Sequence, residues 1–342
     1  MYTLGIETSC DETACAVLKG NDQILANIIS SSLAHHKPFG GVVPEIASRH
    51  CLEAIDLVYR ETLRKARLKP NQIDLIAVTK GPGLIGSIFV GVSFAKALSF
   101  SLDIPLIGVN HIEAHLEANF IGKKKPSKFI GLIVSGGHTS LVRYQNYHYD
   151  LLGETIDDAI GEAYDKVAKI LGLGYPGGPV IDRLAQSGNP KTFSFTKPKQ
   201  DGRFDFSFSG IKTAVLNLHE RNAKQFRSEK FLKDFCASFQ ETVMQWIAQK
   251  TVLACEEEKI KAVVVGGGVS ANSRLRQLLA EETQMREIKL FLPPFELTTD
   301  NAAMIARLGY ALFKKGKRSD FQMVADPSLK IGGTNGNFKH GH

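Results

Sequence analysis

A repeat of one structural unit is the feature of this sequence that most restricts its fold. Each copy opens with an apolar strand, a turn of small and polar residues, and a second strand; the strands are expected at 2–7, 14–18, 129–134 and 141–144. Short strands joined by such turns are typical of β-hairpins. The sequence therefore predicts two hairpins of the same design.

The two copies continue to match beyond the hairpins. In each copy a long segment with helical periodicity precedes a strand, a glycine-rich loop, a helix and a further strand. These elements are expected at 44–66, 74–78, 81–87, up to 99 and 105–109, and again at 233–258, 261–265, 266–272, up to 282 and 288–292. We infer two copies of one α/β unit that face each other across a cleft.

The repeat predicts a division of the chain into two domains. Residues 1–128 form the first domain, and residues 129–300 form the second, which carries an insertion without a counterpart at about 152–211. A helix from about 301 to 327 could return to the first domain. The 342 residues are enough for two domains of ordinary size.

A pair of histidines lies where the last strand of the first copy ends. His111 and His115 are four residues apart in a segment with good helix propensity, so both side chains project from one face of a helix. Neutral imidazoles at this spacing can share one divalent metal. The alternative is a surface helix with two polar residues near its start.

An aspartate occupies the corresponding place in the second copy. Asp300 opens the element after the last strand of that copy, as His111 does in the first. An approximate twofold relation between the copies would bring His111, His115 and Asp300 together. Two imidazoles and a carboxylate leave coordination positions open, which is typical of a catalytic metal site. Alternatively, Asp300 is only the N-cap of the helix that follows it.

The spacing around the histidines disfavours a zinc peptidase. In the peptidase motif H-E-x-x-H the general base directly follows the first histidine, whereas Ile112 occupies that position here. The acid, Glu113, lies two residues after His111 and therefore about 200° around the helix. A metalloprotease is accordingly the weakest of the alternatives.

Glycine-rich turns indicate where a nucleotide could bind. Gly266–Gly268 lies between a strand and a helix, where backbone N–H groups suit a phosphate or an adenosine, and Asn272 could bond base or ribose. The Ser135–His138 turn could hold an anion on its amides, or be an ordinary hairpin turn. Asp165 and Asp182 could accept hydrogen bonds from ribose hydroxyls, or lie at the surface or at helix caps.

Composition and net charge indicate the class of binding partner and the cellular compartment that we expect. The net charge of +7 and the pI near 9.0 suit a polyanion such as nucleic acid, although charge alone is a weak indication. Five cysteines without a CxxC pair fit reduced thiols in a cytosol. No signal peptide is recognised, and the apolar stretch 84–100 carries Lys96. We therefore expect a buried helix there, no membrane span, and a cytoplasmic protein.

Eight motifs, in this order along the chain, together resemble one family. They are ETSCDET, HIEAH, SGGHTSL, IDDAIGEAYDK, YPGGP, FSFSGIKTAV, GGGVSANSRLR and TDNAAMIA. From Thr3 to about Pro327 the sequence closely resembles the TsaD family, also called Gcp, of tRNA threonylcarbamoyladenosine transferases. The resemblance implies the actin-like ATPase (ASKHA) fold, with two duplicated RNase H-like domains around a central cleft.

The resemblance also implies a reaction and its partners. An acyltransferase of this family moves the threonylcarbamoyl group from threonylcarbamoyl-AMP to the exocyclic amine of the adenosine that follows the anticodon in ANN-decoding tRNAs, releasing AMP. Bacterial members work with a shorter TsaB-type paralogue and a TsaE-type ATPase.

The family motifs imply roles for particular residues of this chain. His111, His115 and Asp300 would bind one divalent metal per subunit, with Fe(2+) favoured and Zn(2+) as the other candidate. Asp11 and Glu12 would lie at the mouth of the cleft and support activity. The residues that would line the adenylate are Ile133, Val134, Ser135, Gly136, Gly137, Asp165, Gly178, Asp182 and Asn272.

Two other functions remain alternatives. A small-molecule kinase of the actin-like fold would need an aspartate base and Mg²⁺ held mainly by oxygens, which two histidine ligands disfavour. A non-catalytic assembly module would only scaffold other proteins, which an intact ligand triad disfavours. ATP turnover with a small alcohol or acid would favour the kinase, and failure to transfer with all partners present would favour the module.

Overall fold

The computed structural model describes residues 1–146, 148–195 and 202–332 of the chain. The described chain forms two compact units, one from Met1–Lys125 together with the chain from Thr299 onward, and the other from Pro126–Thr298. The first unit contains β1 Tyr2–Glu7, β2 Glu12–Lys19, β3 Gln23–Ser31, α1 Leu33–His36, η1 Lys37–Phe39, α2 Pro44–Ala66, η2 Pro70–Gln72, β4 Leu75–Gly81, α3 Ile85–Leu102, β5 Leu106–Asn110, α4 His111–Glu117, η3 Ala118–Phe120 and α10 Ala302–Phe313. The second contains β6 Lys128–Val134, β7 Thr139–Gln145, β8 His148–Glu154, α5 Ile160–Ile170, α6 Gly177–Ala185, α7 Ser209–Arg221, η4 Gln225–Arg227, α8 Glu229–Glu257, β9 Ala262–Gly266, η5 Gly268–Ala271, α9 Ser273–Met285, β10 Lys289–Phe291 and η6 Phe295–Leu297.

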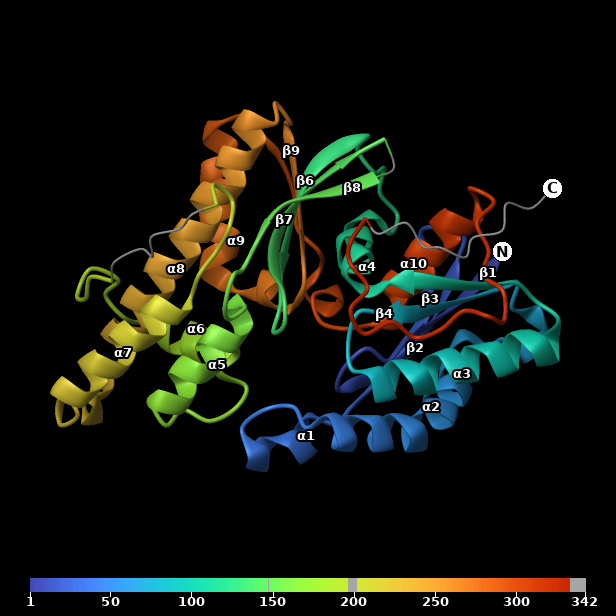
Figure 1. Cartoon of the computed structure of the whole chain (residues 1–342), viewed down its shortest axis with the longest axis horizontal. Helices are drawn as coiled ribbons and strands as arrows, with labels where there is room; N and C mark the ends of the chain where they lie inside the picture. The colour runs from blue at the N-terminus through green and yellow to red at the C-terminus, as the bar shows by residue number, and fades with distance from the viewer. Residues whose placement is uncertain (147, 196–201, 333–342) are drawn as a thin grey trace. The chain divides into compact units, whose positions relative to one another are not determined.

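Each unit is built on one five-stranded sheet, and the two sheets have the same topology (Figure 1). The strand order is β3-β2-β1-β4-β5 in the first unit and β8-β7-β6-β9-β10 in the second. In both, the first three strands in sequence pair antiparallel and the last two join in parallel. The predicted duplication of an α/β unit is therefore confirmed.

The third strand of each unit was missed by the sequence analysis. Both β3 and β8 lie at the edge of their sheet and alternate irregularly between exposed and buried side chains. Half-exposed edge strands with mixed polarity lack the continuous apolar run that indicates a buried strand. The apolar pattern in the sequence therefore predicted the two strands of each hairpin and not the third strand that pairs with them.

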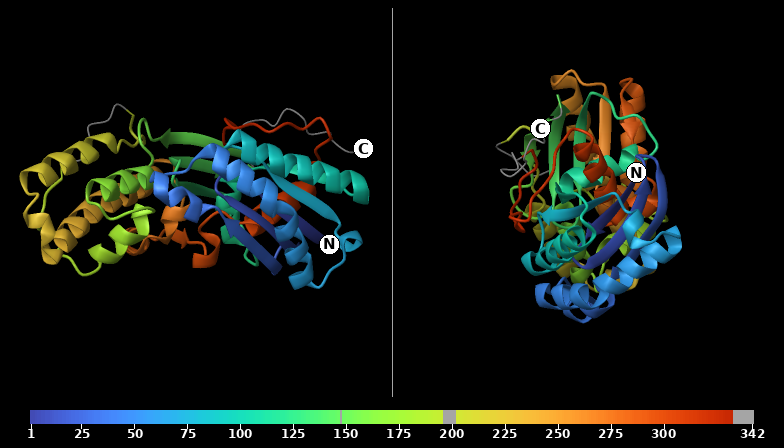
Figure 2. Two further views of the ribbon diagram at one scale, coloured as in Figure 1. Left: turned by 90° about the horizontal axis from the view of Figure 1, so that it is seen from below. Right: turned by 90° about the vertical axis from the view of Figure 1, so that its right-hand side faces the viewer.

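The sheet of the first unit is covered by helices on both faces (Figures 1 and 2). Leu4 and Ile6 of β1 pack in one apolar core with side chains of α2 and α3. Gly5, between them, faces α10, where an added Cβ would lie only 2.1 Å from the carbonyl oxygen of Ala302. Successive strand residues point to opposite faces, so Gly5 faces α10 while Leu4 and Ile6 face the core. Helix α10 can pack this closely on β1 only because Gly5 has no side chain.

Helix α3 is the apolar segment that was expected to be buried rather than to span a membrane. Among the described helices it is the one that is long and apolar enough to cross a bilayer, by length and composition only. It packs against α2 and β4. Core helices of globular proteins pass the same test, so the helix is only weak evidence for a membrane span.

The second unit carries the predicted insertion between β8 and α8, of which residues 196–201 lie outside the described residues. Helix α5 begins at Ile160. The alternating aromatics Phe206 and Phe208 are buried, but they do not form a strand. A single bridge joins Phe206 to Thr155, and α7 begins at Ser209.

Candidate functional site

The two histidines are presented by a helix that grows directly out of the sheet of the first unit. Strand β5 is buried along its length and ends at Asn110, which is the N-cap of α4. The Asn110 side-chain oxygen accepts hydrogen bonds from the N–H groups of Ile112 (2.8 Å) and Glu113 (3.2 Å), so the helix begins at His111. His111 and His115 are both buried, as a shared helical face requires.

Asp300 belongs to the same unit as the histidines, because the unit boundary falls between Thr298 and Thr299. Asp300 was expected to reach the histidines from the second copy of the repeat, but it lies in the first unit. The alternative role of Asp300 as a helix cap was also wrong. Asn301 is the N-cap of α10, and its side chain accepts a hydrogen bond from the N–H of Met304 at 3.1 Å.

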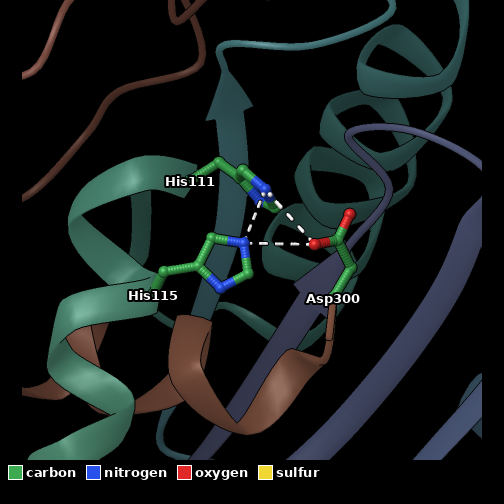
Figure 3. Close-up of side chains that lie close together, drawn as sticks. All are labelled: His111, His115 and Asp300. Atoms are coloured by element: carbon green, nitrogen blue, oxygen red, sulfur yellow. Dashed lines mark hydrogen bonds and ion pairs between the residues drawn. The ribbon is translucent and has the colours of Figure 1, made fainter. Parts of the chain in front are cut away.

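The three side chains form a cluster that could hold a metal ion (Figure 3). Oδ1 of Asp300 lies 3.1 Å from Nε2 of His115 and 3.5 Å from Nε2 of His111, and the two Nε2 atoms are 3.1 Å apart. Ligand atoms about 2.1 Å from a shared ion lie about 3.0–3.4 Å apart when their bonds meet at roughly 90–110°. The donor atoms therefore have the type and the spacing of a metal site.

A buried carboxylate, Glu7 at the end of β1, orients one of these imidazoles. Its Oε2 lies 2.9 Å from Nδ1 of His111 and accepts a bond from the Thr79 hydroxyl at 2.6 Å, while its Oε1 accepts the N–H of Ser9 at 2.5 Å. An ionised carboxylate only accepts hydrogen bonds, so Nδ1 of His111 must carry a proton. The lone pair of Nε2 then points toward Asp300 and His115.

The acidic neighbours of His111 favour positive charge at this place. Burial by itself would raise the pKa of Glu7, but the positive charge and the hydrogen bond of His111 outweigh burial and lower it. Burial by itself would lower the pKa of His111, but the charges of Glu7 and Asp300 raise it to about 9. The Glu7–His111 pair is thus mutually stabilised within the buried site.

Replacing Glu7 by glutamine should weaken metal binding about 10–100-fold, the usual effect of losing a group that orients a metal-ligating histidine. The amide cannot accept all three hydrogen bonds that the carboxylate accepts. The measurement is the metal content of the purified protein after dialysis against a graded series of chelator concentrations.

Thr62→Val is a matched control for the Glu7 variant, because Thr62 is a buried polar residue of the same unit that donates to the backbone of Cys15 and Val58. It should retain metal as the wild type does. Equal retention by the Glu7→Gln protein would show that the carboxylate does not orient a ligand.

Glu113, the acid considered for a peptidase, makes a different contact. Its Oε1 accepts the backbone N–H of Gly332 at 3.2 Å, and burial raises its pKa. The carboxylate is therefore occupied in fastening the C-terminal segment to α4. This contact gives no support to a peptidase arrangement around His111.

A further acid, Glu12, lies close enough to Asp300 for their charges to interact, and Asp11 interacts with Glu12. Glu12 begins β2, and its Oε1 accepts the Ser31 hydroxyl at 3.2 Å. Burial, followed by repulsion from Asp300 and Asp11, raises the pKa of Glu12 to about 10. A cation bound at Asp300 would relieve this repulsion, so the acids make the region favourable for a positive ion.

The predicted adenylate residues all lie in the second unit, beginning with the β6–β7 turn. The N–H of Ser135 donates to the carbonyl of His138 at 2.8 Å, and the N–H of His138 donates to the Ser135 hydroxyl at 3.0 Å. A Cβ added at Gly136 or Gly137 would meet nothing within 4 Å. The turn therefore presents an open backbone surface, while Ile133 and Val134 are buried in the strand before it.

The turn is held by the start of α5 and by the loop after β9. A Cβ at Gly161 would lie 2.8 Å from the Gly136 Cα, and a Cβ at Gly267 would lie 2.4 Å from the Val134 carbonyl oxygen. Gly267 also has φ of 96°, a conformation that favours glycine. The start of α5 and the loop after β9 therefore pack directly against the backbone of the turn and of the strand end before it.

Asp165 lies on α5 and binds the first turn of α6. Its Oδ1 accepts the N–H of Gly177 at 2.7 Å, and hydrogen bonds from Gly177 and Gly178 partly offset burial, which raises its pKa. Asp182 lies within α6 rather than at its cap. The hydrogen bond to Asp165 therefore fixes the position of the first turn of α6, which includes Gly178. The same helix carries Asp182.

Asp182 and Asn272 are linked through a third residue, Gln240 of α8. Gln240 donates to Oδ1 of Asp182 at 2.9 Å and accepts from Nδ2 of Asn272 at 2.8 Å. Asn272 is the N-cap of α9, directly after the loop that contains Gly267. The contacts thus run in a closed circuit from the β6–β7 turn through α5, α6 and α8 to the β9–α9 loop and back to β6.

Sequence reasoning missed two residues that hold this machinery in place, Glu7 and Gln240. Glu7 lies in an apolar strand, and the buried residues beside it give no hint of a partner at His111. Gln240 is a neutral polar residue in a 29-residue helix. The only signal in the sequence was that Glu7 is an ionisable residue inside an apolar run, where a charge is rarely left unpaired.

Comparison with known proteins gives a consistent result. Residues 23–307 match the family described as "TsaD: tRNA N6-adenosine threonylcarbamoyltransferase". A tRNA N6-adenosine threonylcarbamoyltransferase of Dictyoglomus turgidum is 50% identical over 334 residues, which is 97% of this chain and 99% of that protein. The protein of the same name from Bacillus subtilis is 50% identical over 335 residues, or 97% of this chain and 96% of the relative.

Solved structures with low sequence identity share the fold. HypF of T. kodakarensis has a TM-score of 0.60 at 15% identity, covering 92% of this chain and 48% of that one. The component A of (R)-2-hydroxyglutaryl-CoA dehydratase from Acidaminococcus fermentans has a TM-score of 0.52 at 17% identity, covering 91% and 98%. The α/β architecture with two related sheets is the actin-like ATPase fold, as expected. At such identity the likeness carries no function.

Proposed function

The chain belongs to the TsaD family of tRNA N6-adenosine threonylcarbamoyltransferases, and from this we propose that it transfers a threonylcarbamoyl group from threonylcarbamoyl-AMP to a tRNA adenosine, releasing AMP. The acceptor is the exocyclic amine of the adenosine that follows the anticodon in ANN-decoding tRNAs. The observation that carries the proposal is 50% identity to named transferases along 97% of the chain. The net charge of +7 agrees with a polyanionic substrate.

We assign the adenylate to the circuit of contacts in the second unit. The backbone N–H groups of Gly136 and Gly137, at the open part of the β6–β7 turn, suit the phosphate, because backbone N–H groups in a turn bind anions. The carboxylates of Asp165 and Asp182 and the amide of Asn272 suit hydroxyls and the base. Gly178 lies at the start of α6, where the absence of a side chain leaves space beside the ligand.

We assign one divalent metal per subunit to His111, His115 and Asp300. The family resemblance favours Fe(2+), with Zn(2+) as the other candidate. When bound, such an ion supplies a Lewis acid that polarises an oxygen of the donor. Asp11 and Glu12 support activity by making the neighbourhood of Asp300 favourable for positive charge.

The chemistry of the substrates explains why the residues that bind and orient them account for much of the rate of transfer. Threonylcarbamoyl-AMP is a mixed anhydride with AMP as a good leaving group, whereas the adenine amine is a weak nucleophile. Holding the amine against the carbamoyl carbon supplies much of the rate, since orientation of two reactants is worth several kcal/mol. A base in an anticodon loop can be unstacked at little cost to reach such a site.

We propose that the chain acts in the cytoplasm with a TsaB-type paralogue and a TsaE-type ATPase. All five cysteines are free thiols, which fits a reducing compartment. Helices α2 and α3 of the first unit carry the exposed apolar side chains Leu52, Leu57 and Phe89. A surface of this kind is typical of contact with another protein.

The decisive experiment supplies threonylcarbamoyl-AMP and unmodified ANN-decoding tRNA, adds the partner proteins one at a time, and measures metal in the same sample. Digested tRNA should contain threonylcarbamoyladenosine, detected by mass spectrometry, in a one-to-one ratio with released AMP. A tRNA with guanosine in place of the target adenosine is the control and should gain no modification. No product with all partners and metal present would refute the proposal, and ATP consumption with a small alcohol or acid would revive the kinase.

A further inference from the structure

Gln240 is a buried amide whose side-chain hydrogen bonds within the described residues go to residues around the proposed adenylate site. It lies on α8, is only 3% exposed, and contacts Asp182 of α6, Asn272 of α9 and Tyr164 of α5. Nothing in its own helix requires an amide at this position, because its backbone bonds are those of any helical residue. The side chain is therefore explained by its partners.

The direction of the amide follows from a chain of donors and acceptors. The N–H of Leu275 donates to Oδ1 of Asn272 at 2.9 Å, so the other end of that amide, Nδ2, must face Gln240. Oε1 of Gln240 then accepts from Nδ2 and leaves Nε2 to donate to Asp182 at 2.9 Å. The N-cap of α9 thus fixes the orientation of the Gln240 amide, and Gln240 in turn fixes the orientation of the Asp182 carboxylate.

This network also decides which groups face a ligand. Oδ1 of Asp182 accepts from Gln240 and from the Ser273 hydroxyl at 2.7 Å, whereas Oδ2 accepts the Ser273 N–H at the longer distance of 3.2 Å. Among the bonds within the described residues, Oδ1 is thus the more heavily used oxygen. A ligand hydroxyl would accordingly meet Oδ2 of Asp182.

We propose that Gln240 is a positioning residue for the adenosine part of the donor, which it serves by holding Asp182 and Asn272 in one fixed relation. The inference rests on the proposed adenylate site and adds a residue that itself does not touch the ligand. Its role depends on donating one hydrogen bond to Asp182, which hydrophobic packing of α8 alone would not require.

Gln240→Glu tests the inference, because it keeps the size of the side chain and replaces the donor by a carboxylate. The probe is AMP, titrated into the full-length protein and followed by calorimetry. At about pH 8 we expect binding to weaken by about tenfold or more, since a donor is lost and like charges meet. At about pH 6 part of the affinity should return, because a protonated carboxyl can donate to Asp182 again. The titratable groups that bond this side chain are Asp182 and Tyr164, and Cys236, on the same helix as Gln240, lies near Tyr164.

Two further variants separate the inference from loss of folding and from failure of the adenylate site. Ser238→Ala removes a buried hydroxyl of the same helix that bonds Phe193 and Asn189, so it should lower stability and leave AMP binding unchanged. Asp182→Ala should weaken AMP binding.

If Asp182→Ala weakens binding and Gln240→Glu does not, the positioning role is refuted while the adenylate site stands. If Gln240→Glu weakens binding equally at both pH values, the donated hydrogen bond is not the cause, and the inference is refuted. If the wild type binds no AMP, the adenylate site and the inference fail together.

Discussion

Replacing His111 by alanine is expected to remove the bound metal and to lower threonylcarbamoyl transfer by more than about 100-fold, while the chain still folds. The imidazole is one of three donors whose atoms lie 3.1–3.5 Å apart. Losing a ligand should exceed the 10–100-fold effect of losing a group that merely orients one. The measurements are metal content by mass spectrometry and transfer to unmodified tRNA in the same preparation.

The fold should survive this substitution, although the buried carboxylate of Glu7 loses a partner, which costs about 1–3 kcal/mol. Circular dichroism and thermal unfolding report that effect separately from activity. His50→Ala is the matched control, since His50 is a partly buried histidine of the same unit that bonds Ser30 and lies on another helix. Full transfer by the metal-free His111→Ala protein would refute the metal site.

Gly5→Ala is expected to destabilise the protein by about 3 kcal/mol or more, near the upper end for a single added methyl group. The new Cβ would lie 2.1 Å from the carbonyl oxygen of Ala302 and 2.7 Å from the backbone nitrogen of Ala306, so backbone rather than a flexible side chain would have to move. Because α10 begins two residues after Asp300, its displacement should also weaken metal binding. Urea unfolding and metal retention measure the two effects.

Gly41→Ala is the control for this prediction, because a Cβ there meets nothing within 4 Å and the residue does not have positive φ. Its stability and its metal content should match those of the wild type. A Gly5→Ala protein of normal stability would show that α10 does not pack on β1 as described.

The regular part of the fold was predictable because its signals are local. Four strands of the hairpins, the helix before β4 and the long helix α8 are set by apolar periodicity and small polar turns. The edge strands β3 and β8 were not predicted, since their side chains are buried irregularly. The alternation of Phe206 and Phe208 resembles that of a strand buried on one face, but the burial of alternate residues does not require sheet pairing, and within the described residues only an isolated bridge forms there.

The candidate site was predictable to the extent that spacing along the chain determines it. Histidines four residues apart share a helical face, and the structure brings them together with Asp300. The contact of Glu7 with His111 spans 104 residues, and that of Gln240 with Asp182 spans 58, so no local pattern reports either. The same limit explains why Asp300 was assigned to the other unit: its neighbours in sequence belong there.

The return of α10 to the first unit has a consequence for how the protein matures. On the ribosome the two histidines emerge long before Asp300, with an entire second unit synthesised in between. A nascent or truncated chain that ends before Thr299 would display both imidazoles without the carboxylate that completes the trio. Acquisition of the ion would then be one of the last events in biogenesis, so prematurely terminated chains would not trap metal in this site.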